Sequence, residues 1–165
     1  MIQPESHHLA QFNIGRLLAP PDDPRVAAFM NALDAINGLA DRSPGFVWRL
    51  TGAGNNATDL PLAVNDAQLV PNLSVWDSVQ NLEHFVWNTV HRRFYERRAE
   101  WFEILGKMHF AMWWLPAGQV PTLDEALERL DHLRANGDSD RAFGWSYLAQ
   151  ARLWRMTNCT STAAE

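Results

Sequence analysis

A row of polar side chains is the most suggestive feature of the sequence. The capping pattern that begins at Asp77 and the apolar spacing after it predict a helix over residues 78–104, with a candidate break near Thr89. Five polar residues follow one another at spacings of four, three, four and three, and in a continuous helix they would form one stripe: His84, Asn88, His91, Tyr95 and Arg98. We interpret His91 as a candidate proton carrier, because imidazole titrates near neutral pH, and Arg98 as a candidate clamp for an anion or a carbonyl oxygen. A solvated flank of the helix would explain the same stripe.

His109 is the second candidate proton carrier. Alternation predicts a strand over residues 107–115, with His109 and Trp113 on one face. The opposite face would carry the apolar residues Phe110, Met112 and Trp114. His109 could act as a general base or as an axial haem ligand, and a hydrogen-bonded interior histidine is the alternative.

Two further predicted strands carry polar side chains beside aromatic rings. Gln11 and Asn13 alternate with apolar residues in residues 7–14, and Asn72 and Ser74 do so in residues 69–76. Aromatic rings beside amides are typical of a ligand pocket, although buried amides need hydrogen-bond partners in any protein. Trp48, in a predicted strand over residues 46–50, could face either side of the sheet. The residues that we expect to contact a substrate are Gln11, Asn13, Trp48, Asn72, Ser74, Trp76, His84, Tyr95 and Trp113.

The predicted elements follow the order β-α-β-β-α-β. A helix introduced by Asp23 and Pro24 separates the first two strands, and an amphipathic helix over residues 123–133 follows the fourth. This order predicts an α+β fold of the ferredoxin-like split βαβ type, in which both crossover helices cover one face of an antiparallel sheet. We expect the covered face to hold Ala10, Phe12, Ile14, Leu73, Val75, Phe110, Met112 and Trp114.

The other face of this predicted sheet would carry the amides together with Trp76, His109 and Trp113. An exposed apolar patch of this kind usually marks an interface. Pairing two such sheets face to face would cover both and enclose a cavity. We therefore expect a homodimer in the form of a dimeric α/β barrel.

Length and composition limit the class of protein. The 165 residues suggest one domain over residues 1–146, with a helical extension and frayed tail over residues 147–165. The net charge of −5 argues against binding to nucleic acid, and no apolar run reaches the roughly 18 residues of a membrane span. The single cysteine, Cys159, excludes an internal disulfide and a cysteine-based zinc site. We expect a cytoplasmic protein with no metal and no cofactor.

Several of these segments together resemble a known family. The run from Asn72 to Trp76, the histidines His84 and His91, the run Glu100-Trp101-Phe102 and the run from Trp113 to Gly118 are similar to the DUF3291 proteins. The resemblance covers residues 8–143. It implies a branch of the dimeric α/β-barrel superfamily, whose members include antibiotic-biosynthesis-type monooxygenases, haem-degrading enzymes, and small cyclases and isomerases. It implies fold and dimerisation, and it places a histidine at position 91, but it implies no particular reaction.

The sequence therefore favours a small-molecule enzyme that binds an apolar aromatic or polyketide-like substrate. The expected chemistry is cofactor-independent monooxygenation or proton-transfer isomerisation or cyclisation, since electron-rich substrates of this type react once they are deprotonated. Two alternatives stay open. One is a non-catalytic dimer that binds a small ligand, and the other is a haem protein with His91 or His109 as the axial ligand.

Overall fold

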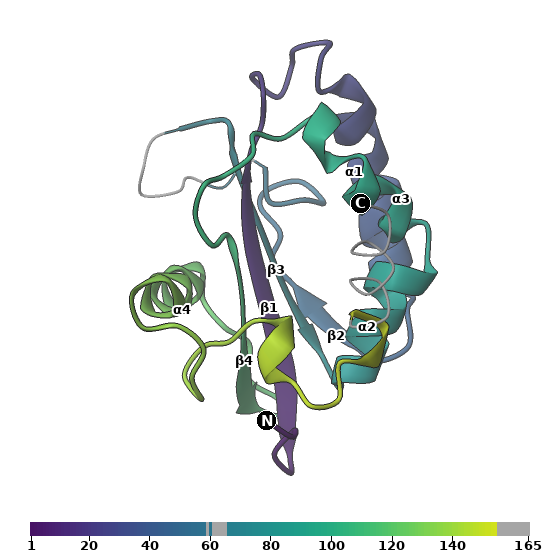
Figure 1. Cartoon of the computed structure of the whole chain (residues 1–165). Helices are drawn as coiled ribbons and strands as arrows, with labels where there is room; N and C mark the ends of the chain where they lie inside the picture. The colour runs from purple at the N-terminus through teal and green to yellow at the C-terminus, as the bar shows by residue number, and fades with distance from the viewer. Residues whose placement is uncertain (59, 61–65, 155–165) are drawn as a thin grey trace, which may run out of the picture.

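The computed structural model describes residues 1–58, 60 and 66–154, and the predictions that concern Cys159 and the end of the tail lie outside these residues. The described chain has an α+β fold built on a four-stranded antiparallel sheet in the order β2-β3-β1-β4 (Figure 1). The strands are β1 (His7–Arg16), β2 (Phe46–Arg49), β3 (Leu69–Trp76) and β4 (Phe110–Pro116). The four predicted strands are confirmed, and the sheet is open because β2 and β4 lie at its edges.

Helices lie on both faces of the sheet. On one side are α1 (Ala27–Asp41), α2 (Val79–Asn88) and α3 (His91–Glu96), and on the other side is α4 (Leu123–Asn136) (Figure 1). Two short 3-10 turns, Arg98–Glu100 and Trp145–Tyr147, complete the described elements.

The long helix predicted over residues 78–104 is broken. Ser78 caps α2 by accepting a hydrogen bond from the Asn81 backbone N–H, and α2 ends at Thr89, whose backbone is extended. The Thr89 hydroxyl donates to the Phe85 carbonyl oxygen at 2.6 Å, which satisfies one of the carbonyls left free at the helix end. The candidate break at Thr89 is confirmed, and the continuous helix is wrong.

The register between strands corrects the predicted faces. Gln11 lies opposite Ser74 of β3 and opposite Met112 of β4, and so these three side chains share a face. Trp113 instead lies opposite Ala10, on the other face. The prediction that Phe110, Met112 and Trp114 share the face of Phe12 is therefore wrong. Because side chains alternate along a strand, a shift of one residue in the pairing of β4 inverts its faces.

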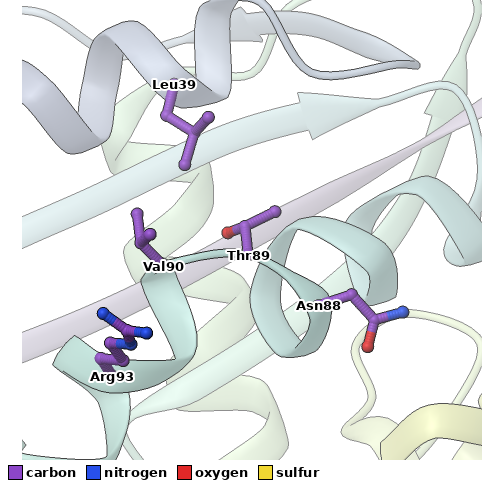
Figure 2. Close-up of a pocket in the computed structure, with 5 residues that line it drawn as sticks. All are labelled: Leu39, Asn88, Thr89, Val90 and Arg93. Atoms are coloured by element: carbon purple, nitrogen blue, oxygen red, sulfur yellow. The ribbon is translucent and has the colours of Figure 1, made fainter.

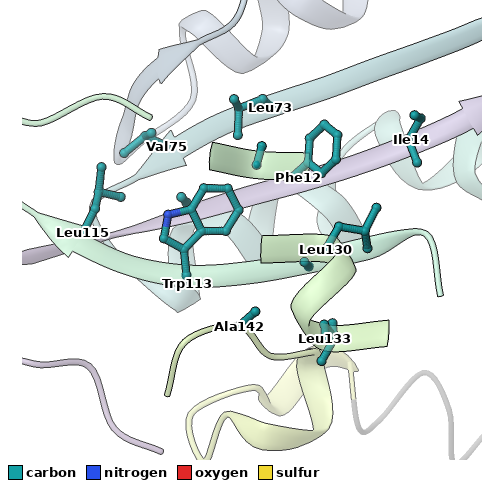
Figure 3. Packing of buried hydrophobic residues seen from close by; sticks show 12 residues of the cluster. Phe12, Ile14, Leu73, Val75, Trp113, Leu115, Leu130, Leu133 and Ala142 are labelled. Atoms are coloured by element: carbon teal, nitrogen blue, oxygen red, sulfur yellow. The ribbon is translucent and has the colours of Figure 1, made fainter. Parts of the chain in front are cut away.

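The face of the sheet that carries Phe12 and Trp113 is covered by α4 (Figure 3). Its side chains pack against the α4 residues Ala126, Leu130 and Leu133, which recur every three or four positions along the helix. The strand residues of this cluster are Ala10, Phe12, Ile14, Leu73, Val75, Ala111, Trp113 and Leu115. The face of Gln11 and Trp76 lies instead beneath α1 to α3. The prediction that it faces away from the crossover helices, free to pair with a second sheet, is wrong.

The C-terminal segment packs at one end of the layer between the sheet and α1 to α3. Phe143 exchanges two backbone hydrogen bonds with Met112, and Leu148 and Ala151 are buried in the cluster that contains Trp76. Glu83 of α2, only 2% exposed, accepts hydrogen bonds from the backbone N–H groups of Arg152 and Trp154 at 3.1 and 3.0 Å. This carboxylate attaches the segment to α2.

Replacing this carboxylate should loosen the segment. Glu83→Gln removes the charge that strengthens both bonds, and so we expect the amides of Arg152 and Trp154 to exchange hydrogen about tenfold faster. Hydrogen exchange followed by mass spectrometry measures this change. Glu96→Gln, at an exposed position paired with Arg92, is the control and should leave these amides unchanged. Equal exchange in the wild type and Glu83→Gln would contradict the attachment.

Candidate functional site

A polar band crosses the sheet face beneath α1 to α3. It consists of Gln11, Asn13, Asn72 and Ser74, which the registers of β1 and β3 place side by side. Apolar clusters flank the band at both ends, one around Trp76 and one around Leu17 and Val70. We call the layer of side chains between the sheet at this band and α1 to α3 the interlayer. The prediction that these four side chains and Trp76 share one face is confirmed.

The buried members of the band are hydrogen-bonded to each other. Trp76 Nε1 donates to Ser74 Oγ at 3.0 Å, and Ser74 Oγ donates to Gln11 Oε1 at 3.3 Å. Gln11, 6% exposed, also places Nε2 at 3.4 Å from the backbone oxygen of Asn72. Half a turn of the Gln11 amide instead brings its oxygen within 3.0 Å of Asn13 Nδ2. In this second orientation both ends of the buried amide meet partners of the right kind.

The helices do not seal the interlayer. The Asn72 side chain is exposed and Asn13 is half-buried, although both lie on the face that the helices cover. The row of apolar side chains along α1 is also only half-buried, and Ala40 is the single buried residue of this helix. The half-buried residues of that row are Phe29, Met30, Leu33, Ile36 and Leu39. Polar groups of the band and apolar groups of this row are therefore both partly exposed to solvent.

An aromatic stack connects the band to His91. The Trp76 ring packs edge-on against Phe46 at 5.4 Å and is stacked on Phe85 at 5.1 Å between centroids. The His91 ring follows at 4.8 Å from Phe85. Since Trp76 also donates to Ser74, the imidazole is joined to the band through two rings.

His91 is held in a neutral form. Removal from water lowers the pKa of His91 from its usual 6.5, and this effect outweighs the opposite influence of the Val86 carbonyl. Nδ1 lies 3.4 Å from Val86 O and must donate there, since a carbonyl oxygen only accepts. Nε2 then carries the free lone pair, and it makes no hydrogen bond with any residue that the structure describes.

The other members of the predicted helical stripe lie outside the interlayer. Tyr95, Arg98 and His84 are exposed. The Arg98 guanidinium lies 4.2 Å from the centre of the Tyr95 ring and donates to the Tyr95 carbonyl oxygen at 2.8 Å. Arg98 follows the end of α3 and contacts Tyr95, and no contact between its guanidinium and His91 is found within the described residues.

Three more predicted residues are placed away from the band. His109 is exposed and precedes β4, and its carbonyl oxygen accepts from the Ile14 N–H at 3.0 Å. Trp113 is fully buried against α4, with Arg129 at 5.9 Å from its ring centre. Trp48 lies opposite Val75 because a bulge follows Phe46, and it packs on the α4 side. The prediction that His109 shares the cavity face is wrong, for the reason given for β4.

A hollow of about 470 Å³ opens where α2 and α3 meet α1. Figure 2 shows Leu39 of α1 pointing toward Val90 and Thr89 of the α2–α3 corner, with Arg93 beside them. Asn88 completes the lining. Sequence reasoning missed this hollow and Arg93, and the break signal at Thr89 was the feature that could have indicated them.

A family match covers all the segments that resemble the DUF3291 proteins. The model of the domain of unknown function DUF3291 matches residues 8–159. The chain belongs to the DUF3291 family. The match extends past residue 143, so the C-terminal segment attached by Glu83 is part of the DUF3291 domain.

Two solved structures are similar to this DUF3291 chain. PA3566 from Pseudomonas aeruginosa is 18% identical, with a TM-score of 0.46, over 70% of this chain and 99% of that one. A protein of unknown function from Nitrosomonas europaea, NE2512, is 12% identical, also with a TM-score of 0.46, over 72% and 99%. No curated protein matches the chain.

The described part of the DUF3291 structure contains neither a cluster of metal-ligating side chains nor a membrane-spanning helix. Within the described residues, no group of three or more His, Cys, Asp or Glu side chains is placed to hold a metal ion. In the same part of the chain, no helix combines the length and the apolar character needed to cross a bilayer.

The lowered pKa of His91 predicts a pH dependence of stability. The unfolded chain binds this proton more readily than the folded one, and so the free energy of unfolding should fall as the pH drops through 6.5 toward the lowered pKa. His91→Phe should remove this part of the pH dependence. Denaturant unfolding measures the free energy of unfolding between about pH 5 and 8, the range in which a histidine changes its charge. His132→Gln, on α4, should retain it. Identical profiles in all three proteins would refute the assignment.

Proposed function

We propose that this DUF3291 protein is a small-molecule enzyme in which His91 removes a proton from a ligand bound in the interlayer. The observation that carries the proposal is the His91 ring packed against Phe85, whose Nδ1 lies 3.4 Å from the Val86 carbonyl oxygen while Nε2 has no partner among the described residues. The aromatic stack and the polar band supply surfaces for an apolar aromatic or polyketide-like substrate.

The proposed step is removal of a proton from a carbon next to a carbonyl group. The proton moves to His91 Nε2, and the electron pair of the C–H bond passes to the carbonyl oxygen, which gives an enolate. Return of the proton to another carbon completes an isomerisation or accompanies a cyclisation. In the monooxygenase alternative dioxygen oxidises the enolate: one oxygen atom forms a carbonyl group at the deprotonated carbon, and the other leaves as water with the two hydrogens that this carbon gives up.

A general-base reaction of an aromatic probe tests the proposal without knowledge of the substrate. In 5-nitrobenzisoxazole, a base removes one ring proton while the N–O bond opens to a coloured phenolate. We expect the wild type to exceed free imidazole at equal concentration, and His91→Gln to lower the rate by about 100-fold. The rate should rise with pH through the lowered pKa of His91 and level off by pH 6.5.

The control for this assay is His132→Gln, which removes a histidine on the opposite side of the sheet and should leave the rate unchanged. Equal rates in the wild type and His91→Gln would overturn the base assignment. Probe binding without acceleration would instead support the second candidate function, a non-catalytic small-ligand protein, which the half-covered interlayer also favours.

We also propose that the fold is a ferredoxin-like split βαβ related to the dimeric α/β barrels, and that the chain forms a homodimer. The antiparallel order β2-β3-β1-β4, with crossover helices on one side, supports the first proposal. The second is supported by the family resemblance. Since α4 covers the apolar face and α1 to α3 cover the band, neither sheet face is free for pairing, and the contact must involve other surfaces.

Sedimentation velocity at micromolar concentration should therefore give a dimer. Trp113→Glu places a charge between the sheet and α4, and so it should lower stability and cause aggregation rather than release a folded monomer. A wild-type monomer would refute the homodimer, and a soluble, folded Trp113→Glu monomer would refute the placement of Trp113 beneath α4.

A further inference from the structure

Four arginines lie close together on the chain from α3 to the turn that follows it, and three of them have partners. Arg92 pairs with Glu96 at 2.7 Å, and Arg97 pairs with Glu100 at 2.8 Å. Arg98 lies on the Tyr95 ring and donates to its carbonyl oxygen. The guanidinium of Arg93 has no hydrogen bond or ion pair with the described residues. A guanidinium left in this state has its five donors available for a ligand.

Arg93 is also the only one of these four that lines the hollow at the α2–α3 corner (Figure 2). Leu39 and Val90 provide apolar contacts in this hollow, and Asn88 and Thr89 provide polar ones. The Thr89 hydroxyl is already donated to Phe85, and Glu96, one turn along α3, is engaged with Arg92. Arg93 is therefore the uncompensated cation of a mixed polar and apolar surface.

The hollow adjoins the interlayer. Leu39 is the last residue of the half-buried row on α1, and it packs against the cluster that contains Trp76 and Phe85. Val90 directly precedes His91, whose ring turns inward onto Phe85. The hollow thus lies at the end of the interlayer where the candidate base is located.

We infer that Arg93 is a specificity-determining residue that binds an anionic oxygen group of the ligand, such as a carboxylate or a phenolate, while the apolar body of the ligand contacts Leu39 and Val90. The fork of guanidinium donors matches two oxygens of a carboxylate, which a neutral analogue lacks. This inference rests on the small-molecule binding of the proposed function and does not depend on proton transfer by His91.

Two fluorescent probes of similar apolar body separate the effect of charge from that of burial. 8-Anilinonaphthalene-1-sulfonate carries an anionic group, and N-phenyl-1-naphthylamine is neutral. We expect Arg93→Gln to weaken binding of the anionic probe about tenfold and to leave the neutral probe unchanged. Added salt should weaken binding of the anionic probe to the wild type more than to Arg93→Gln, because salt screens a charge in a hollow that is open to solvent.

Arg92→Gln is the matched control, since it removes a neighbouring exposed charge that is paired outside the hollow, and it should leave both probes unchanged. Arg93→Lys should recover part of the affinity for the anionic probe. Equal losses in Arg92→Gln and Arg93→Gln, equal losses of both probes, or no saturable binding of the anionic probe would overturn the inference. The benzisoxazole assay is read separately, so failure of His91 as a base and failure of Arg93 as an anion site give different results.

Discussion

The polar band in the middle of one sheet face is the constraint on which the rest of the structure depends. An amide or hydroxyl removed from water without a partner costs on the order of 1–3 kcal/mol, and so the three amides and one hydroxyl of the band must each find a partner or keep contact with water. Gln11 and Ser74 are buried because they bond to each other and to Trp76. Asn13 and Asn72 keep contact with water. The helices above the band consequently stand over two separate apolar clusters rather than one continuous core.

The opposite face compensates for this incomplete packing. There the central side chains of β1, β3 and β4 are apolar, and α4 supplies a matching row of Ala126, Leu130 and Leu133. This core is the one continuous apolar cluster that joins β1, β3 and β4 to α4. This division between a packed side and an accessible side is common where a rigid scaffold carries a binding surface.

The alternation of side chains was sufficient to predict all four strands and the shared face of Gln11, Asn13, Asn72 and Ser74. The same rule failed for β4, because residues 110–115 are apolar on both faces and contain no polar side chain that fixes which face turns inward. The error transferred His109 and Trp113 to the wrong side. Local spacing could not predict which face of the sheet α4 covers, because that depends on packing. It also could not predict that the His91 ring turns inward, because that depends on the break at Thr89. The role of Arg93 could not be predicted, because the spacing of charges in the sequence is the same whether or not an arginine forms an ion pair.

The attachment of the C-terminal segment has a consequence for synthesis on the ribosome. Phe143, Leu148 and Ala151 complete the cluster around Trp76 and Phe85, yet they emerge from the exit tunnel after all four strands. Until these residues emerge, the rings of Trp76 and Phe85 are less covered in the nascent chain. Glu83 also lacks the two backbone N–H groups that it binds in the folded protein. The last part of the described chain to be translated is thus the part that protects the earlier elements from intermolecular association.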